Sequence, residues 1–265
     1  MSVAGERDEG VLERRDHERV AWLTLNRPAA RNALSVALMT ALEDALDTIG
    51  EDGSVHVVVI AANGPAFCAG HDLREMRANP GRGSYEALFT QCSRLMTKLV
   101  RLPKPVIARV HGVATAAGCQ LVASCDLAVA AVGARFATPG VDIGLFCSTP
   151  MVALSRAVGR KAAMEMLLTG DLIGAGQAQA LGLVNRVVPE ADLDAAVAAL
   201  ARQIAEKSPL TVAIGKEAFY AQAEMPLDEA YRYAAEVMTR NMLARDAEEG
   251  IDAFLTKRAP LWTGH

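Results

Sequence analysis

Apolar and polar positions alternate in short, regular blocks along the first 190 residues. Ser35 is a good helix N-cap, and apolar residues follow it at helical spacing. This pattern predicts an amphipathic helix over Val36–Ile49. A second helix is predicted from Tyr85 to about Leu102, where prolines follow. Short apolar runs typical of buried strands occupy Val20–Leu25, Val55–Ala62, Val106–Val110 and Leu127–Ala131. The succession of strands, turns and helices predicts an α/β fold.

Beyond residue 192 the pattern is almost entirely helical. It is broken at Ser208-Pro209, at Pro226 and at Gly250, which predicts a series of separate helices. Their apolar positions can pack on the core or on another subunit. The Gly- and Pro-rich stretch Asn79–Ser84 is expected to be a mobile surface loop.

The stretch His111–Asp126, HGVATAAGCQLVASCD, holds small residues at the start of a predicted buried helix. The first turn of a helix has free N–H groups and the positive end of the helix dipole, and small side chains let a ligand approach them. This combination favours a carbonyl oxygen that gains negative charge, and forms half of an oxyanion hole. The alternative is a close helix–helix contact that requires small residues.

A second stretch, FCAGHDLREM at Phe67–Met76, has the same design. Ala69-Gly70 permits a tight turn between an apolar strand and a short helical run. Two such turns can direct two backbone N–H donors at one carbonyl oxygen, which completes the predicted oxyanion hole.

These two stretches, with LNRPAARNALS at Leu25–Ser35 and the segment Arg156–Pro189, resemble the crotonase, or enoyl-CoA hydratase/isomerase, superfamily. The similarity runs from about residue 10 to about residue 260, and is greatest with a subgroup named enoyl-CoA hydratase domain-containing proteins. The resemblance implies a spiral core of ββα turns over residues 1–200, carrying the acyl-CoA site. It also implies a helical region over residues 201–265 for oligomerisation and part of the CoA site, and a homotrimer or a hexamer formed by two trimers.

The resemblance implies acyl-CoA chemistry through an enolate-like thioester held by two backbone N–H groups. When the family motif is matched to this sequence residue by residue, the two donors are the backbone N–H groups of His71 and Ala117. The imidazole of His71, unusual for the family, either approaches the acyl group as an acid or base or points aside. The other substrate-lining positions are Asp72, Leu73, Arg74, Gly118 and Gly140.

Gln120 and Gly140 stand where a hydratase of this family has its two glutamates. A carboxamide has no usable pKa, so efficient hydration by the family mechanism is expected to be lost while thioester binding is kept. Asp142, two residues after Gly140, is a candidate catalytic base, or it caps the turn before Gly144. Ser148 and Cys147 are weaker candidates, and His111 is interpreted as a hydrogen-bonded turn residue.

For CoA binding, the segment with Arg27, Arg31 and Asn32 offers positive charge and backbone contacts to the nucleotide end. The resemblance points to Phe254 and Lys257 near the C-terminus, in a family segment that contacts CoA, often from a neighbouring subunit. Any of these charges can equally be an ordinary surface charge. CoA enters as part of the substrate, and no other cofactor is implied.

Composition limits the other classes of function. The net charge is −4 and the basic residues are scattered, which is unlike a nucleic-acid-binding protein. No uncharged apolar run approaches the roughly 18 residues of a membrane span. The five cysteines show no C-x-x-C pairing, so neither a metal site nor a disulfide framework is expected. The polar start MSVAGERDEG indicates a cytoplasmic protein.

Two functions remain open. One is an enzyme acting on acyl-CoA thioesters in fatty-acid or acyl-CoA metabolism, as a hydratase, isomerase, hydrolase or lyase. The other is a catalytically silent acyl-CoA-binding or regulatory protein that kept the pocket. A Rossmann dehydrogenase and a serine hydrolase are disfavoured because the sequence has no G-x-G-x-x-G after a strand and no G-x-S-x-G.

Overall fold

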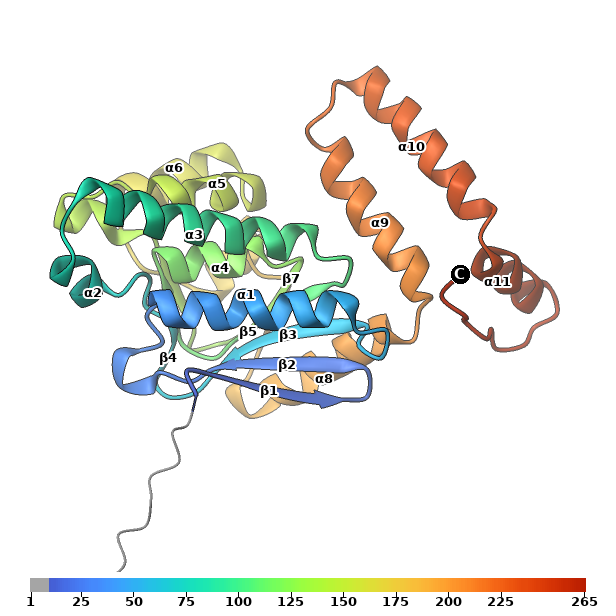
Figure 1. Cartoon of the computed structure of the whole chain (residues 1–265), viewed down its shortest axis with the longest axis horizontal. Helices are drawn as coiled ribbons and strands as arrows, with labels where there is room; N and C mark the ends of the chain where they lie inside the picture. The colour runs from blue at the N-terminus through green and yellow to red at the C-terminus, as the bar shows by residue number, and fades with distance from the viewer. Residues whose placement is uncertain (1–9) are drawn as a thin grey trace, which may run out of the picture.

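The computed structural model describes residues 10–265, and its strands form two sheets (Figure 1). The six-stranded sheet has the order β1 (Leu12–His17), β2 (Val20–Leu25), β3 (Val57–Ala62), β5 (Val106–Val110), β7 (Leu127–Ala131), β10 (Arg186–Val188). The four-stranded sheet has the order β4 (Ala66–Cys68), β6 (Val113–Thr115), β8 (Arg135–Ala137), β9 (Ile173–Gly174). All pairings are parallel except β1 with β2 and β8 with β9.

The chain supplies the two sheets in alternation. β3 leads to β4, β5 to β6 and β7 to β8, so each turn of the chain adds one strand to each sheet. This is the spiral of ββα turns that the resemblance implied. Because β4, β6 and β8 pair in parallel, their carboxyl ends meet at one edge, with Thr115 opposite Ala137. The chain segments that follow these ends are therefore brought together.

Helices cover both faces of the six-stranded sheet. α1 (Val36–Glu51), α3 (Arg82–Arg101) and α4 (Ala117–Ser124) lie on one side, and α8 (Leu193–Ala205) lies on the other (Figure 1). Strand residues alternate between the two sides: Ile60 joins the core under α1, while Val59 packs toward α8. A parallel sheet buried on both faces explains why its strands are continuous apolar runs.

The remaining helices are α2 (Leu73–Ala78), α5 (Ser148–Ala157), α6 (Arg160–Thr169), α7 (Ala175–Leu181), α9 (Pro209–Gln222), α10 (Leu227–Met242) and α11 (Arg245–Leu255), with short 3₁₀ turns at Pro28–Ala30, Pro139–Ile143 and Glu190–Asp192. Two boundaries differ from the expected ones. The helix expected from Tyr85 begins at Arg82, so half of the predicted surface loop is helical. A division after residue 200 would cut α8, whose buried face packs on the sheet.

The last three helices, α9 to α11, extend away from the sheets (Figure 1). Lys216 on α9 anchors them, because its buried ammonium donates to the carbonyls of Leu99 (2.9 Å) and Lys104 (3.0 Å) and to the carboxylate of Asp126 (2.7 Å). The hydroxyl of Tyr220 donates to the same carboxylate at 2.9 Å. Burial lowers the pKa of Lys216, but three acceptors satisfy its three donors. Within residues 10–265, no helix is both long and apolar enough to cross a membrane.

Replacing Lys216 by Met should reduce the free energy of unfolding by about 3 kcal/mol, because it leaves the Asp126 carboxylate without its cation. Denaturant unfolding would measure this loss, and hydrogen exchange would show whether α9 opens first. Lys161→Met, on the exposed surface of α6, is the matched control. Equal stability of the two variants would mean that the ion pair does not anchor α9.

Candidate active site

The two small-residue turns meet at the carboxyl ends of β4 and β6. A Cβ atom on Gly70 would lie 2.9 Å from the Cβ of Ala116 and 3.4 Å from the nitrogen of Ala117. A Cβ atom on Gly118 would lie 2.1 Å from the carbonyl oxygen of Cys68. Larger residues at either glycine would therefore push the turns apart. The close contact that requires small residues is therefore also what brings the two turns together.

Ala116 holds the second turn in a strained conformation. Its φ of +50° and ψ of −118° lie in a region that usually requires glycine. The Ala116 N–H donates to the carbonyl of Ala137 at 2.9 Å, which fixes the turn against β8. The next N–H, that of Ala117, opens α4 and donates to no other group in residues 10–265. It is a free donor at the positive end of a helix.

His71 presents a second free N–H. Leu34 bridges the residues on either side of it: the Leu34 N–H donates to Gly70 O at 2.7 Å, and Asp72 N–H donates to Leu34 O at 3.1 Å. In such a parallel bridge the central residue directs its own N–H away from the partner strand. Among the described residues, nothing accepts a hydrogen bond from the His71 N–H.

Arg27 and Asp72 hold the first turn in place. The Arg27 guanidinium donates to Ala33 O at 2.5 Å and to the Asp72 carboxylate at 2.9 Å. Asp72 also caps α2 by accepting from the N–H groups of Arg74 and Glu75. The Arg27 hydrogen bond is the largest cause of the lowered pKa of Asp72. The structure thus uses both side chains to support the turn, where contacts with CoA and substrate were expected.

Asn32 completes this support, and its structural role was missed in the sequence. It is fully buried with a φ of +54°, accepts from Arg27 N–H at 2.8 Å and donates to the carbonyls of Asn63 and Ala66, both at 2.8 Å. Asparagine is one of the few residues that tolerates the left-handed region, so an Asn in the turn after Pro28 was a signal for this role.

The imidazole of His71 points toward α3. Its ring lies edge-on to Phe89, with 5.6 Å between centroids and 71° between planes. Both ring nitrogens are buried and have no hydrogen-bond partner among the described residues. Burial lowers the pKa of this imidazole, with a smaller opposing effect of the Leu34 backbone, and so favours the neutral ring.

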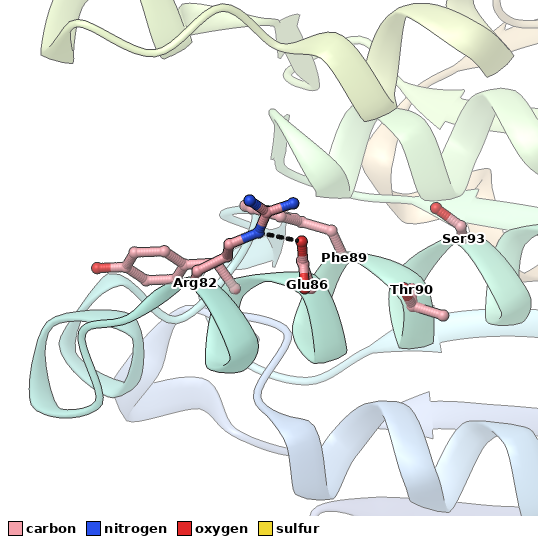
Figure 2. Close-up of a pocket in the computed structure, with 6 residues that line it drawn as sticks. Arg82, Glu86, Phe89, Thr90 and Ser93 are labelled. Carbon is pink, nitrogen blue, oxygen red and sulfur yellow. Dashed lines mark hydrogen bonds and ion pairs between the residues drawn. The ribbon is translucent and has the colours of Figure 1, made fainter.

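Gln120 lies three residues after Ala117, on the same side of α4. Its buried carboxamide accepts a weak hydrogen bond from the Cys92 thiol at 3.9 Å. Gln120 also lines a cavity of about 1270 Å³ enclosed by α3, α4, α5 and α9. A second, more open cavity of about 520 Å³ runs along α3 and is lined by Phe89 and Ser93 (Figure 2). Ser93 lines both cavities, so they adjoin at this residue.

Gly140 is closed to a side chain. A Cβ there would lie 2.2 Å from Leu145 O and 2.8 Å from the sulfur of Cys147, and Leu145 N–H donates to Gly140 O at 2.8 Å. The backbone of Gly140 does not have the positive φ that would by itself require glycine. The restriction is steric and comes from the loop that follows.

Asp142 lies apart from Gln120. Its exposed carboxylate faces Gly170 and lines a third cavity of about 630 Å³ that also includes Arg31. Ser148, in contrast, lines the cavity of Gln120, although its exposed hydroxyl approaches only Phe146 O, at 3.4 Å. Burial raises the pKa of the Cys147 thiol and keeps it protonated. The structure therefore brings no carboxylate to Gln120 from the 140–148 loop.

The remaining predicted residues are more distant from the turns. Leu73 and Arg74 are exposed on α2. Phe254 and Lys257 are exposed at the end of α11, which lies across the molecule from β4 and α2 (Figure 1). Within one chain they do not reach the two small-residue turns. His111 binds Gly64 O at 2.8 Å, as interpreted for a turn residue.

All five cysteines are buried and free. Within residues 10–265, no group of three or more His, Cys, Asp or Glu side chains is placed to hold a metal ion.

Comparison with known proteins agrees with this geometry. A Xenopus laevis protein named enoyl-CoA hydratase domain-containing protein 3, mitochondrial, is 48% identical over 241 residues, covering 91% of this chain and 82% of the relative. The crystal structure of a Mycobacterium smegmatis enoyl-CoA hydratase superposes with a TM-score of 0.94 at 56% identity, covering 96% of this chain and 99% of that one. The human enoyl-CoA hydratase domain-containing protein 3 superposes with a TM-score of 0.93 at 46% identity, covering 95% and 100%.

The names of relatives correct one expectation. The Xenopus laevis protein and four further relatives of the same name are called mitochondrial, which contradicts the cytoplasmic location inferred from the polar start of the sequence. Nine of the ten residues behind that inference, 1–9, lie outside the described residues.

The sequence also matches the family described as enoyl-CoA hydratase/isomerase over residues 15–265. The spiral fold, the two converging turns and this match agree, and the chain belongs to the enoyl-CoA hydratase/isomerase family.

Proposed function

We propose that the protein binds acyl-CoA thioesters, with the thioester oxygen held between the N–H groups of His71 and Ala117. The observation that carries the proposal is the meeting of two turns that each leave one N–H without an acceptor. Donors fixed in this way stabilise negative charge as it develops on a carbonyl oxygen. The acyl chain then extends past Gln120 into the cavities along α3. Gly118 stays small because it packs on Cys68, and the site serves acyl-CoA or fatty-acid metabolism.

Hydration through two carboxylates is not the reaction that these residues favour. Gln120 has a carboxamide where the family mechanism needs an ionisable group, and Gly140 has no room for a side chain. The retained amides support binding and polarisation of a thioester, while the acid–base groups for adding water are missing. Asp142 stays a candidate base only if its loop moves toward Gln120. The alternative function is a catalytically silent acyl-CoA-binding or regulatory protein, which the same two replacements favour.

Ala117→Pro tests the oxyanion hole directly. Proline removes the N–H at the first position of α4, where a helix tolerates it best. A bound conjugated thioester such as cinnamoyl-CoA absorbs at longer wavelength when hydrogen bonds polarise its carbonyl. We expect this shift with the wild type and its loss with Ala117→Pro.

Arg160→Pro controls for a proline at the first position of a helix: the residue before it has extended backbone angles of −59° and 145°, whereas Ala116 before position 117 has angles of +50° and −118°. Thermal melting would verify that both variants are folded. An unchanged shift in folded Ala117→Pro would exclude Ala117 as a donor.

Wild-type hydration of crotonyl-CoA should be about 10⁴-fold slower than that of a relative with both glutamates, since each missing group accounts for about 10²-fold. Gln120→Glu should recover about 10²-fold, because the carboxylate would enter the cavity beside the thioester. Gly140→Glu should recover nothing and should lower stability, because its Cβ would meet Leu145 O. An absorbance assay of the enoyl thioester measures all three proteins.

Gly133→Glu is the control for adding a glutamate to a turn, since a Cβ there meets nothing within 4 Å. Rapid hydration by the wild type would contradict the expected loss, and Asp142→Asn would then show whether that carboxylate is the base.

We also propose a homotrimer, or a hexamer of two trimers, in which a neighbouring chain brings Phe254 and Lys257 to the CoA. The support is the large apolar side chains left uncovered on α10 and α11: Leu227, Tyr231, Met238, Leu243, Phe254 and Leu255, of which Leu243 and Phe254 are each 83% exposed.

Light scattering at micromolar concentration should give a mass of three or six chains of 28.0 kDa. Leu243→Glu combined with Phe254→Glu should lower that mass by placing charges in the interface. A wild-type monomer would contradict the proposed assembly.

A further inference from the structure

The imidazole of His71 is a buried polar group without a partner. Both ring nitrogens are covered, and neither has a hydrogen bond within residues 10–265. A neutral imidazole carries one donor and one acceptor, and leaving either unpaired in a protein interior is unfavourable. Such a group in a folded protein calls for an explanation, and a ligand that supplies the missing partner is one.

The position of the ring limits what that ligand can be. His71 is the same residue whose N–H is proposed to hold the thioester oxygen, so its side chain starts beside the reacting carbonyl. The ring then reaches Phe89 on α3, which lines the cavity of Figure 2. Only a group a few bonds from the thioester carbon can meet both the N–H and the ring.

The groups that line the cavity beside Phe89 favour a neutral partner for His71. The charged side chains on the cavity, Arg82 and Glu86, pair with each other at 2.7 Å. The other polar groups lining it are the hydroxyls of Tyr85, Thr90 and Ser93. A carboxylate would require a protonated imidazole, which burial disfavours. A hydroxyl or carbonyl oxygen can pair with the neutral ring.

A role as general base is less compatible with this arrangement. A catalytic histidine needs a second group on its other nitrogen to orient the ring and to stabilise the imidazolium. Among the described residues no carboxylate binds either nitrogen of His71, and the backbone of Leu34, which partly offsets the lowering of the pKa, makes no hydrogen bond of normal geometry with the ring. The ring is suited to recognise an oxygen atom, not to take a proton.

We propose that His71 is a specificity-determining residue, which selects acyl-CoA thioesters that carry a hydroxyl or carbonyl oxygen close to the thioester over plain alkyl thioesters. This inference rests on the proposed function, since the thioester must lie between His71 and Ala117.

Calorimetry with butyryl-CoA, 3-hydroxybutyryl-CoA and 4-hydroxybutyryl-CoA tests the selection. The wild type should bind at least one hydroxylated thioester about tenfold or more tightly than butyryl-CoA, because the plain chain leaves the imidazole unpaired. His71→Phe should abolish this preference, and because it keeps the backbone N–H, the oxyanion hole is not removed. His71→Gln should retain part of the preference, and His17→Phe, exposed on β1, controls for loss of a histidine.

The outcomes separate the two proposals. If no thioester binds to the wild type, the proposed function is wrong. If all three bind equally well, or if folded His71→Phe keeps the preference, acyl-CoA binding stands and the selection by His71 is overturned. Chromatography of the recovered ligands would show that they were not converted during the measurement.

Discussion

The contact between the two small-residue turns is the constraint on which the rest of the site depends. Gly118 packs so closely on Cys68 O, and Gly70 on Ala116 and Thr115 O, that no side chain fits between them. This proximity follows from the spiral, because β4, β6 and β8 pair in parallel and end at one edge. The strain at Ala116 is held by a hydrogen bond to β8, so the position of the Ala117 N–H is set before any ligand arrives. Donors that need no reorganisation are the ones that stabilise developing charge best.

Much of this could be predicted from the sequence, because it depends on local patterns. The strand Val106–Val110 and the strand Leu127–Ala131 have the predicted bounds, and Ser35 caps α1 as expected. Apolar runs, caps and glycine turns act over a few residues, so they can be recognised without knowing the fold. The spiral itself was implied by family resemblance, since no internal repeat marks its turns.

The contacts that individual side chains make could not be predicted from local patterns in this way. Charge pattern does not tell whether an arginine faces solvent or a neighbouring turn, and Arg27 proves to bind Asp72, 45 residues away in sequence. Likewise, Asp142 was a candidate base because it lies two residues after Gly140, but the segment is a 3₁₀ turn and the Asp142 carboxylate faces Gly170. Phe254 and Lys257, which were expected at the CoA site, are instead exposed at the end of α11, across the molecule from the two turns (Figure 1). Each difference arises from long-range packing, which local sequence does not encode.

The proposed chemistry of the site depends on two kinds of group: the backbone N–H donors, and the side chains at the positions of the family's glutamates. The two N–H donors belong to the backbone, so they survive any substitution that leaves the turns intact, such as Ala at 117 or His at 71. The carboxylates of the family mechanism are side chains, and the resemblance places Gln120 and Gly140 at their positions, where the fold is unchanged. The proposed acyl-CoA site combines two free N–H donors with an unpaired imidazole, and its proposed selectivity depends on side chains that the fold does not constrain.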